Sequence, residues 1–363
     1  MNGIVLEKVS LRPNRICFYK EYNGFNKRNK QYLNSVNDFI GDNVDNKDEN
    51  VNSKSLENLK NNKHKFKLSK SAQKSIKEKI HWLYELSKEK TIKTLNNKKL
   101  TNIKITFITL TLPSVQNHDT SIIIKECLNQ LITELRKNYE LNNYLWKCEY
   151  QRNGNVHFHL VCDVYIDYFI VNTKWNRIIN KLGYIDEYSN KFSAMSCKDY
   201  IAYSLENIDM YKNDNKTSYK EKVKKIVNSY NSGKSKNWKQ PNTTDVKIVY
   251  NAKAIGSYIA KYISKNENEK VNDKVKNRDG KDSNLRLWYC SRSLSKLTSI
   301  KLYIEENNDN LDYLLGELNV KNEFILDYVT LWFYDTAEQS KEFKELSRAY
   351  FGDYAKSLGY LPN

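Results

Sequence analysis

The feature that most constrains the fold of this chain is a pair of strand-like segments on either side of Asn153-Gly154. YLWKCEYQR precedes this dipeptide and VHFHLVCDVYI follows it. Asn-Gly between two runs of β-branched, aromatic and apolar residues is the strongest short-range signal for a β-hairpin. The sequence therefore predicts a sheet in which one hairpin carries two histidines.

Strand and helix patterns alternate around this hairpin. KITFITLTLP reads as a strand that ends at Pro113, and VKIVY and RLWYC are shorter strand-like segments. Apolar residues recur at helical spacing within residues 68–95, 120–139, 167–182, 252–266 and 336–358. Asp119 or Thr120 is the expected cap of the second of these helices.

Composition divides the chain into a central part and two extensions. Residues 24–65 are dominated by Asn, Lys and Asp, and they contain too few apolar residues to become ordered by burial. We predict an N-terminal extension over 1–100 with one amphipathic helix, a central domain over 101–300 and a C-terminal α/β extension over 301–363. The polar residues 207–243 read as a surface insertion in the central domain.

The net charge of +17, from 60 Lys and Arg against 43 Asp and Glu, suits a polyanionic partner such as a phosphate backbone. AT-biased codon usage, which favours Lys and Asn, is an alternative source of that charge. The six cysteines are widely spaced without a CxxC pair, which excludes zinc-finger spacing and favours reduced thiols. No apolar run reaches the roughly 18 residues of a membrane span, so we expect a cytoplasmic protein.

His157 and His159 stand two residues apart in VHFHLV. Alternate residues of a strand share a face, so the two imidazoles project together while Phe158 and Leu160 point to the opposite, core side. Two imidazoles on one strand can supply two nitrogen ligands to a divalent cation. The alternative is a surface hairpin whose histidines are merely polar.

The length of the hairpin loop decides whether Glu149 joins the histidines. A two-residue turn would pair Tyr150 with His157 and send Glu149 to the other face. A three-residue loop would pair Gln151 with His157 and Glu149 with His159, all on one face. Metal binding therefore predicts a loop with an odd number of residues.

A second group of reactive side chains lies in AIGSYIAKYISKN, where Tyr258, Lys261, Tyr262 and Lys265 form two overlapping Tyr-x-x-Lys units. On a helix these four side chains lie on one stripe. A phenol activated by a lysine or by a metal-bound phosphate could attack a phosphodiester, which gives a phosphotyrosine and a free 3′ hydroxyl. The alternative is an amphipathic helix that packs its aromatic rings on the sheet.

TFITLTLP, HFH and SYIAKYISK, in this order, together resemble the motifs of the HUH endonuclease superfamily, specifically the rolling-circle replication initiators of small bacteriophages and plasmids of the two-tyrosine type. The resemblance covers about Thr101 to Leu297, and LWYCSRSL adds a less specific match. It implies an α+β fold with a central antiparallel sheet of the HUH/RRM-like type and packed helices. Relaxases place their tyrosine before the histidines, so the motif order favours an initiator or a transposase.

The resemblance also implies roles for individual residues. Mg²⁺ or Mn²⁺ would be held by His157 and His159, with Glu149 as the best third ligand and Gln151 as the alternative. The catalytic group would comprise the two tyrosines, of which either could act first, and two lysines that orient them: Tyr258, Tyr262, Lys261 and Lys265.

DNA would be bound by basic residues that flank the site in sequence, namely Lys253, Arg286, Arg292 and Lys296, unless these form only a solvated charged face. The expected partners are single-stranded DNA or an origin hairpin, with a host helicase and polymerase, because the GKS at 233–235 has Asn228 where a Walker A loop needs glycine. The remaining alternatives are a transposase of the same chemistry and a non-catalytic basic nucleic-acid-binding protein.

Overall fold

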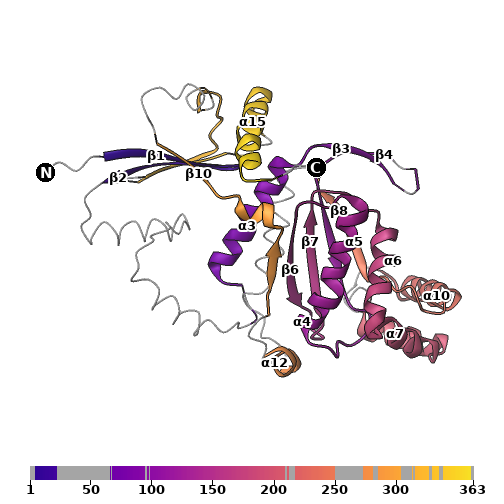
Figure 1. The fold of residues 1–363 in the computed structure, drawn as a ribbon. Coiled ribbons are helices and arrows are strands. Elements are labelled where there is room, and N and C mark those ends of the chain that lie inside the picture. Colours follow the sequence, from indigo (N-terminus) through magenta and orange to yellow (C-terminus); the bar gives the residue numbers. More distant parts are fainter. Residues whose placement is uncertain are drawn as a thin grey trace.

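The computed structural model describes residues 5–22, 66, 68–94, 96–97, 99–208, 211, 217–249, 273–280, 285–303, 313, 315–326, 329–334 and 338–360. Two five-stranded antiparallel sheets dominate it (Figure 1). The predicted α+β class with a central antiparallel sheet is confirmed.

The central sheet has the strand order β8-β5-β7-β6-β9. Its strands are β5 (Ile105–Leu110), β6 (Tyr144–Tyr150), β7 (Val156–Cys162), β8 (Thr244–Val249) and β9 (Trp288–Cys290). The first four follow the split βαββαβ pattern, in which one helical crossover joins β5 to β6 and another joins β7 to β8.

Helices cover one face of this sheet, called here the helix face. The β5–β6 crossover consists of α4 (Thr120–Ile122), a π-helical segment (Ile123–Leu128) and α5 (Asn129–Tyr139). The β7–β8 crossover contains α6 (Tyr168–Ile179), a 3₁₀ turn (Asn180–Leu182), α7 (Tyr184–Ser193), α8 (Cys197–Asn207) and α10 (Tyr219–Ser235). Phe158 and Leu160 are fully buried in the core under these helices, as their alternation with the histidines predicts.

The opposite face, called here the histidine face, is apolar at one end and polar at the other. Phe107, Leu145 and Val161 belong to the apolar end and pack in one core with α3 (Lys70–Leu86) and α15 (Lys341–Ser357). The polar end carries His157 and His159. The apolar half of this face thus fastens the central sheet to the rest of the molecule, and the polar half is available for chemistry.

The second sheet joins the two ends of the chain. Its order is β10-β1-β2-β12-β11, with β1 (Val5–Arg12), β2 (Arg15–Tyr22), β10 (Ile300–Tyr303), β11 (Asn322–Leu326) and β12 (Val329–Phe333). The sequence assigns these strands to two separate extensions, whereas β1 pairs with β10 and β2 pairs with β12. Figure 1 shows this sheet beside α15 and α3, on the far side of α3 from α5 and α6.

Some elements differ in extent from their sequence patterns. The helix expected over residues 68–95 ends at Leu86, and a two-stranded ribbon of β3 (Lys90–Lys93) and β4 (Lys99–Ile103) follows it. The 207–243 insertion contains the 17-residue helix α10, whose Ile226 is buried with Trp238 in a small aromatic core. The predicted disorder over 24–65 lies outside the described residues.

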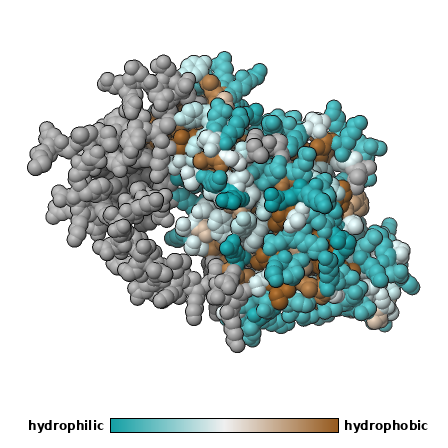
Figure 2. All heavy atoms as spheres, viewed as in Figure 1, coloured by the Kyte–Doolittle hydropathy of each residue, from teal (hydrophilic) through white to brown (hydrophobic). Residues whose placement is uncertain are grey.

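Hydrophilic residues cover most of the coloured surface in Figure 2, and hydrophobic residues form small separate patches there. None of the helices within the described ranges is long and apolar enough to cross a membrane. The six cysteines are free thiols, as their spacing predicts, and five of them are buried.

Candidate functional site

The β6–β7 hairpin turns through a three-residue loop, Arg152 to Gly154. Gly154 donates its amide to the Gln151 carbonyl at 2.8 Å, and the Gln151 amide donates to the Asn155 carbonyl at 2.9 Å. Gly154 has φ +86°, the left-handed conformation that closes such loops and that glycine adopts without strain. The predicted odd loop length is confirmed.

The pairing partners within the hairpin differ from those expected. Glu149 lies opposite His157, and Lys147 lies opposite His159. The sequence argument placed Gln151 and Glu149 in these positions, because it put the three loop residues one position later in the chain. The shift moves the strand by one pair of residues, so the face is unchanged and Glu149 still lies on the histidine face.

Four side chains form the polar end of the histidine face: Lys147, Glu149, His157 and His159. The two imidazole centroids are 4.5 Å apart. Glu149 Oε2 lies 3.4 Å from His159 Nε2, and Glu149 Oε1 lies 2.7 Å from Lys147 Nζ. Lys147, Glu149 and His159 are buried, whereas His157 is half-buried.

The Glu149 carboxylate is held in its charged form by its neighbours. Burial alone would raise the pKa of Glu149, but the hydrogen bond from His159 and the charge of Lys147 outweigh burial and lower this pKa to about 2. A buried carboxylate that stays ionised throughout the physiological range is suited to ligate a cation.

Both histidines make a contact through Nδ1. Gln151 Nε2 lies 3.2 Å from His157 Nδ1, and Thr109 Oγ1 lies 3.5 Å from His159 Nδ1. Metal-bound histidines are commonly held in this way, with the second ring nitrogen fixed by a neighbouring oxygen and Nε2 left for the metal. An amide side chain can be turned to present its oxygen to Nδ1, so Gln151 fits the role of an orienting residue better than that of a third ligand.

The donor set suits a divalent cation, although it is not closed around one point. Two ligand atoms each about 2.1 Å from one ion are separated by about 3.0–3.4 Å, and the 3.4 Å between His159 Nε2 and Glu149 Oε2 is at the upper end of that range. Among the residues with described positions, no group of three or more His, Cys, Asp or Glu side chains forms a metal-holding cluster. A third ligand from His157 therefore requires its side chain to move.

The proposed nucleophile segment cannot be located in the same way. Tyr258, Lys261, Tyr262 and Lys265 lie outside the described residues, and so does Lys253. The described chain ends at Val249 of β8 and resumes with α12 (Asp273–Asp279).

The other three proposed DNA-binding residues lie on β9, α13 (Arg292–Lys296) and their junctions. Arg286 is exposed, with its guanidinium 5.9 Å from the ring centre of Tyr289, whose neighbour Trp146 belongs to the helix-face core. Arg292 is exposed. Lys296 donates to the Leu358 carbonyl at 3.1 Å and so contacts the end of α15.

Sequence reasoning missed Lys147 and Thr109, which border the histidines on neighbouring strands. The alternation within YLWKCEY would have revealed Lys147, since it stands two residues before Glu149 and shares its face. The pairing of Thr109 with His159 depends on strand order, which has no local signal in the sequence.

The chain was compared with known proteins. A family model described as Replication-associated protein ORF2 matches residues 105–267, somewhat under half of the chain. The match supports a family of replication initiators. It begins at the first residue of β5, includes the histidine hairpin and extends beyond Lys265. Neither the curated proteins nor the solved structures yielded a match.

Proposed function

We propose that this protein is a replication initiator that nicks single-stranded origin DNA by tyrosine transesterification, with Mg²⁺ or Mn²⁺ bound on the histidine face. The observation that carries the proposal is the arrangement of Glu149, His157 and His159 on one sheet face, each imidazole contacted at Nδ1. The replication-associated family match supports the same role.

The path of the chain between β8 and β9 supports a meeting of the tyrosines with the histidines. β8 and β9 are parallel strands at opposite edges of the sheet, so their connection has to cross β5, β7 and β6. The β7–β8 crossover starts on a strand of the same direction, moves the opposite way and lies on the helix face. Crossovers keep one hand, so we expect the β8–β9 connection to cross the histidine face.

In this proposal the phenolic oxygen of Tyr258 attacks phosphorus as the bond from phosphorus to the 3′ oxygen breaks. The 3′ oxygen takes a proton and leaves as a free hydroxyl, and the 5′ phosphate stays on the tyrosine. A bound divalent cation would supply Lewis-acid polarisation of the phosphate oxygens. Tyr262 would perform the second cleavage, either tyrosine could act first, and Lys261 and Lys265 would orient the phenols or the phosphate.

A host helicase and polymerase would supply unwinding and synthesis. Gly233, Lys234 and Ser235 lie at the end of α10 rather than in a loop between a strand and a helix, so they lack the context of a phosphate-binding loop. A β-carbon at Gly233 would collide with the ring of Trp238, which gives this glycine a packing role.

The test uses a pool of single-stranded oligonucleotides of randomised sequence, each labelled at its 3′ end. Cleavage would leave the label on the protein, and a denaturing gel would show a covalent adduct with Mn²⁺ that EDTA prevents. Replacing both tyrosines, Tyr258→Phe with Tyr262→Phe, should reduce the adduct at least a hundredfold. Tyr219→Phe with Tyr313→Phe, at two exposed tyrosines, is the matched control and should leave it unchanged.

Separate outcomes test separate parts of the proposal. An absence of adduct in the wild-type protein with both Mn²⁺ and Mg²⁺ would refute strand transfer. An adduct that persists in the double tyrosine variant would refute the choice of nucleophiles. An adduct that persists in His157→Ala with His159→Ala, together with unchanged Mn²⁺ binding by calorimetry, would refute the metal site.

A further inference from the structure

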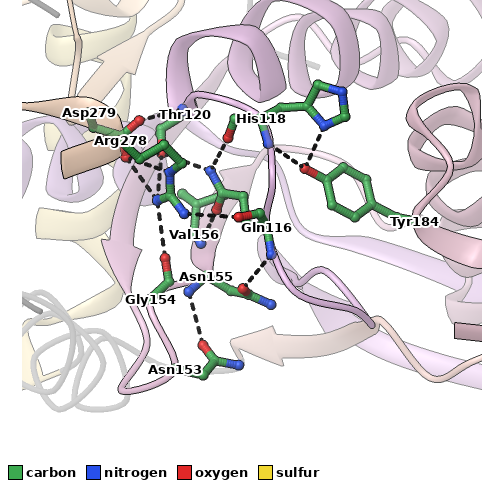
Figure 3. Close-up of polar contacts among 10 residues, drawn as sticks. All are labelled: Gln116, His118, Thr120, Asn153, Gly154, Asn155, Val156, Tyr184, Arg278 and Asp279. Carbon is green, nitrogen blue, oxygen red and sulfur yellow. Dashed lines mark hydrogen bonds and ion pairs between the residues drawn. The ribbon is translucent and has the colours of Figure 1, made fainter. Parts of the chain in front are cut away.

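A second polar cluster lies where the hairpin loop, the segment before α4 and the end of α12 meet (Figure 3). Asp279 is 2% exposed and accepts from the Thr120 amide at 2.8 Å and from the Thr120 hydroxyl at 2.7 Å. Arg278 is ion-paired with Asp279 at 2.8 Å and also donates to the Gly154 carbonyl at 3.1 Å. We call Arg278 and Asp279 the α12 clamp.

The α12 clamp replaces a local helix cap. Asp119 is the N-cap residue of α4, as the sequence predicts, but its side chain makes no capping hydrogen bond. The carboxylate that caps Thr120 belongs instead to Asp279, which is 159 positions further along the chain. A local Asp would have met the same need, so the distant carboxylate ties α12 to the helix as well as capping it.

The same cluster holds the hairpin loop next to His157. Gln116 accepts from the Val156 amide through Oε1 at 2.7 Å, and its own amide donates to Asn155 Oδ1 at 2.9 Å. Arg278 reaches the Gln116 carbonyl at 3.4 Å as well as the Gly154 carbonyl. Residues 154–156, directly before His157, are therefore gripped both by the segment before α4 and by α12 (Figure 3).

We infer that Arg278 and Asp279 are positioning residues that fix the end of the β8–β9 connection on the loop of the histidine hairpin. This inference rests on the proposed function, since that connection carries Tyr258 and Tyr262 in the sequence. Tyr262 precedes the first residue of α12 by 11 positions, and the clamp residues end that helix. The clamp thus joins the two halves of the proposed site, nucleophiles on one segment and metal ligands on the other.

The test compares Asp279→Asn with the wild-type full-length protein in cleavage of the oligonucleotide that gives the best adduct. Asparagine keeps the shape of Asp279 but loses the ion pair to Arg278 and the strong acceptor for Thr120. We expect kcat to fall about tenfold to a hundredfold, as for small misplacements of reacting groups. KM for DNA and the Kd for Mn²⁺ should stay within about twofold, because the proposed metal ligands lie on β6 and β7.

Asp167→Asn is the matched control, since Asp167 is the N-cap of α6, accepts from the Phe169 amide at 3.0 Å and lies outside the cluster. It should leave kcat unchanged. Arg278→Lys, which can still reach a carbonyl, should retain more activity than Arg278→Met. All assays are run well below the melting temperature of each variant, so that a loss of stability alone does not lower kcat.

Failure of the inference and failure of the proposed function give different results. If the wild-type protein forms the adduct and Asp279→Asn cleaves at the wild-type rate, only the inference is overturned. It is also overturned if Mn²⁺ affinity falls in step with kcat, because the clamp would then support the metal ligands alone. If the wild-type protein forms no adduct, the proposed function itself has failed.

Discussion

Lys147 is the residue on the histidine face that most affects how a cation would bind there. Its ammonium occupies one oxygen of Glu149, so a metal could use only the other oxygen, Oε2. Its positive charge also lies close to the proposed cation position, which weakens cation binding by Coulomb repulsion. This chain is therefore expected to hold its metal loosely and to exchange it readily.

Replacing Lys147 with Met should tighten Mn²⁺ binding. Removing a like charge is worth about 1 kcal/mol even at the low end for a solvent-screened pair, which corresponds to about fivefold in Kd. Isothermal titration calorimetry measures this directly. Lys247→Met is the control, because Lys247 lies on the edge strand β8, is exposed and is paired with Asp245; unchanged or weaker binding in Lys147→Met would contradict the argument.

Asp163, directly after β7, should make stability depend on pH. Burial raises its pKa to about 6, against hydrogen bonds from Asn143 and the charge of Lys90 that favour the carboxylate. Because the folded pKa lies above the unfolded one, its contribution is greatest below about pH 4 and is lost as pH rises through 6. The shift of about two units corresponds to at most about 3 kcal/mol.

Asp163→Asn should therefore gain stability relative to the wild-type protein between pH 4 and pH 7. Urea unfolding at both pH values measures the difference, and the exposed carboxylate of Asp245, replaced by Asn, serves as control. A stability difference between wild type and Asp163→Asn that is the same at both pH values would show that Asp163 does not cause the dependence.

Among the elements, the hairpin was the most predictable and the connections were the least. Asn153-Gly154 and the β-branched runs indicate the hairpin locally, and its odd loop follows from requiring Glu149 beside the histidines. The exact pairing was missed, because it depends on where the left-handed residue falls, and only Gly154 adopts it in this loop. Helix α3 was predicted too long since no glycine or proline marks its end at Leu86.

Gly154→Ala tests the loop as an element. An alanine with φ near +86° costs about 1–2 kcal/mol, which should appear as a lower free energy of unfolding and weaker Mn²⁺ binding through the displaced hairpin. Gly352→Ala in α15 is a matched control with the opposite sign, because its β-carbon would meet open space and helices favour alanine over glycine by about 0.5–1 kcal/mol. Equal effects at the two positions would contradict this account.

At the scale of the whole molecule, the sequence predicted the class of the central sheet but not the second sheet. The strand pattern and the HFH motif both point to the central sheet. The pairing of β2 with β12 joins residues about 300 positions apart and leaves no periodic or local trace. The nucleophile half of the site was predicted from spacing alone, and its geometry remains a prediction.

The core shared by both sheets implies that they unfold together. Phe351 of α15 is 2% exposed and packs edge-on against Trp82 of α3 at 5.3 Å. Phe351→Ala should cost about 3–5 kcal/mol and should speed hydrogen exchange in β5 as well as in α15. Lys356→Ala on the same helix is the control, and faster exchange in α15 without any change in β5 would show two independent units.

The pairing of β2 with β12 also sets an order of assembly during synthesis. A ribosome that adds about 5–20 residues per second takes roughly 15–60 s to make the stretch of about 300 residues between these strands. Until then β1 and β2 have only each other, and a lone two-stranded hairpin is marginally stable in water. The first strands to emerge from the ribosome are thus among the last to find their places, after the histidine-bearing sheet has all of its own strands.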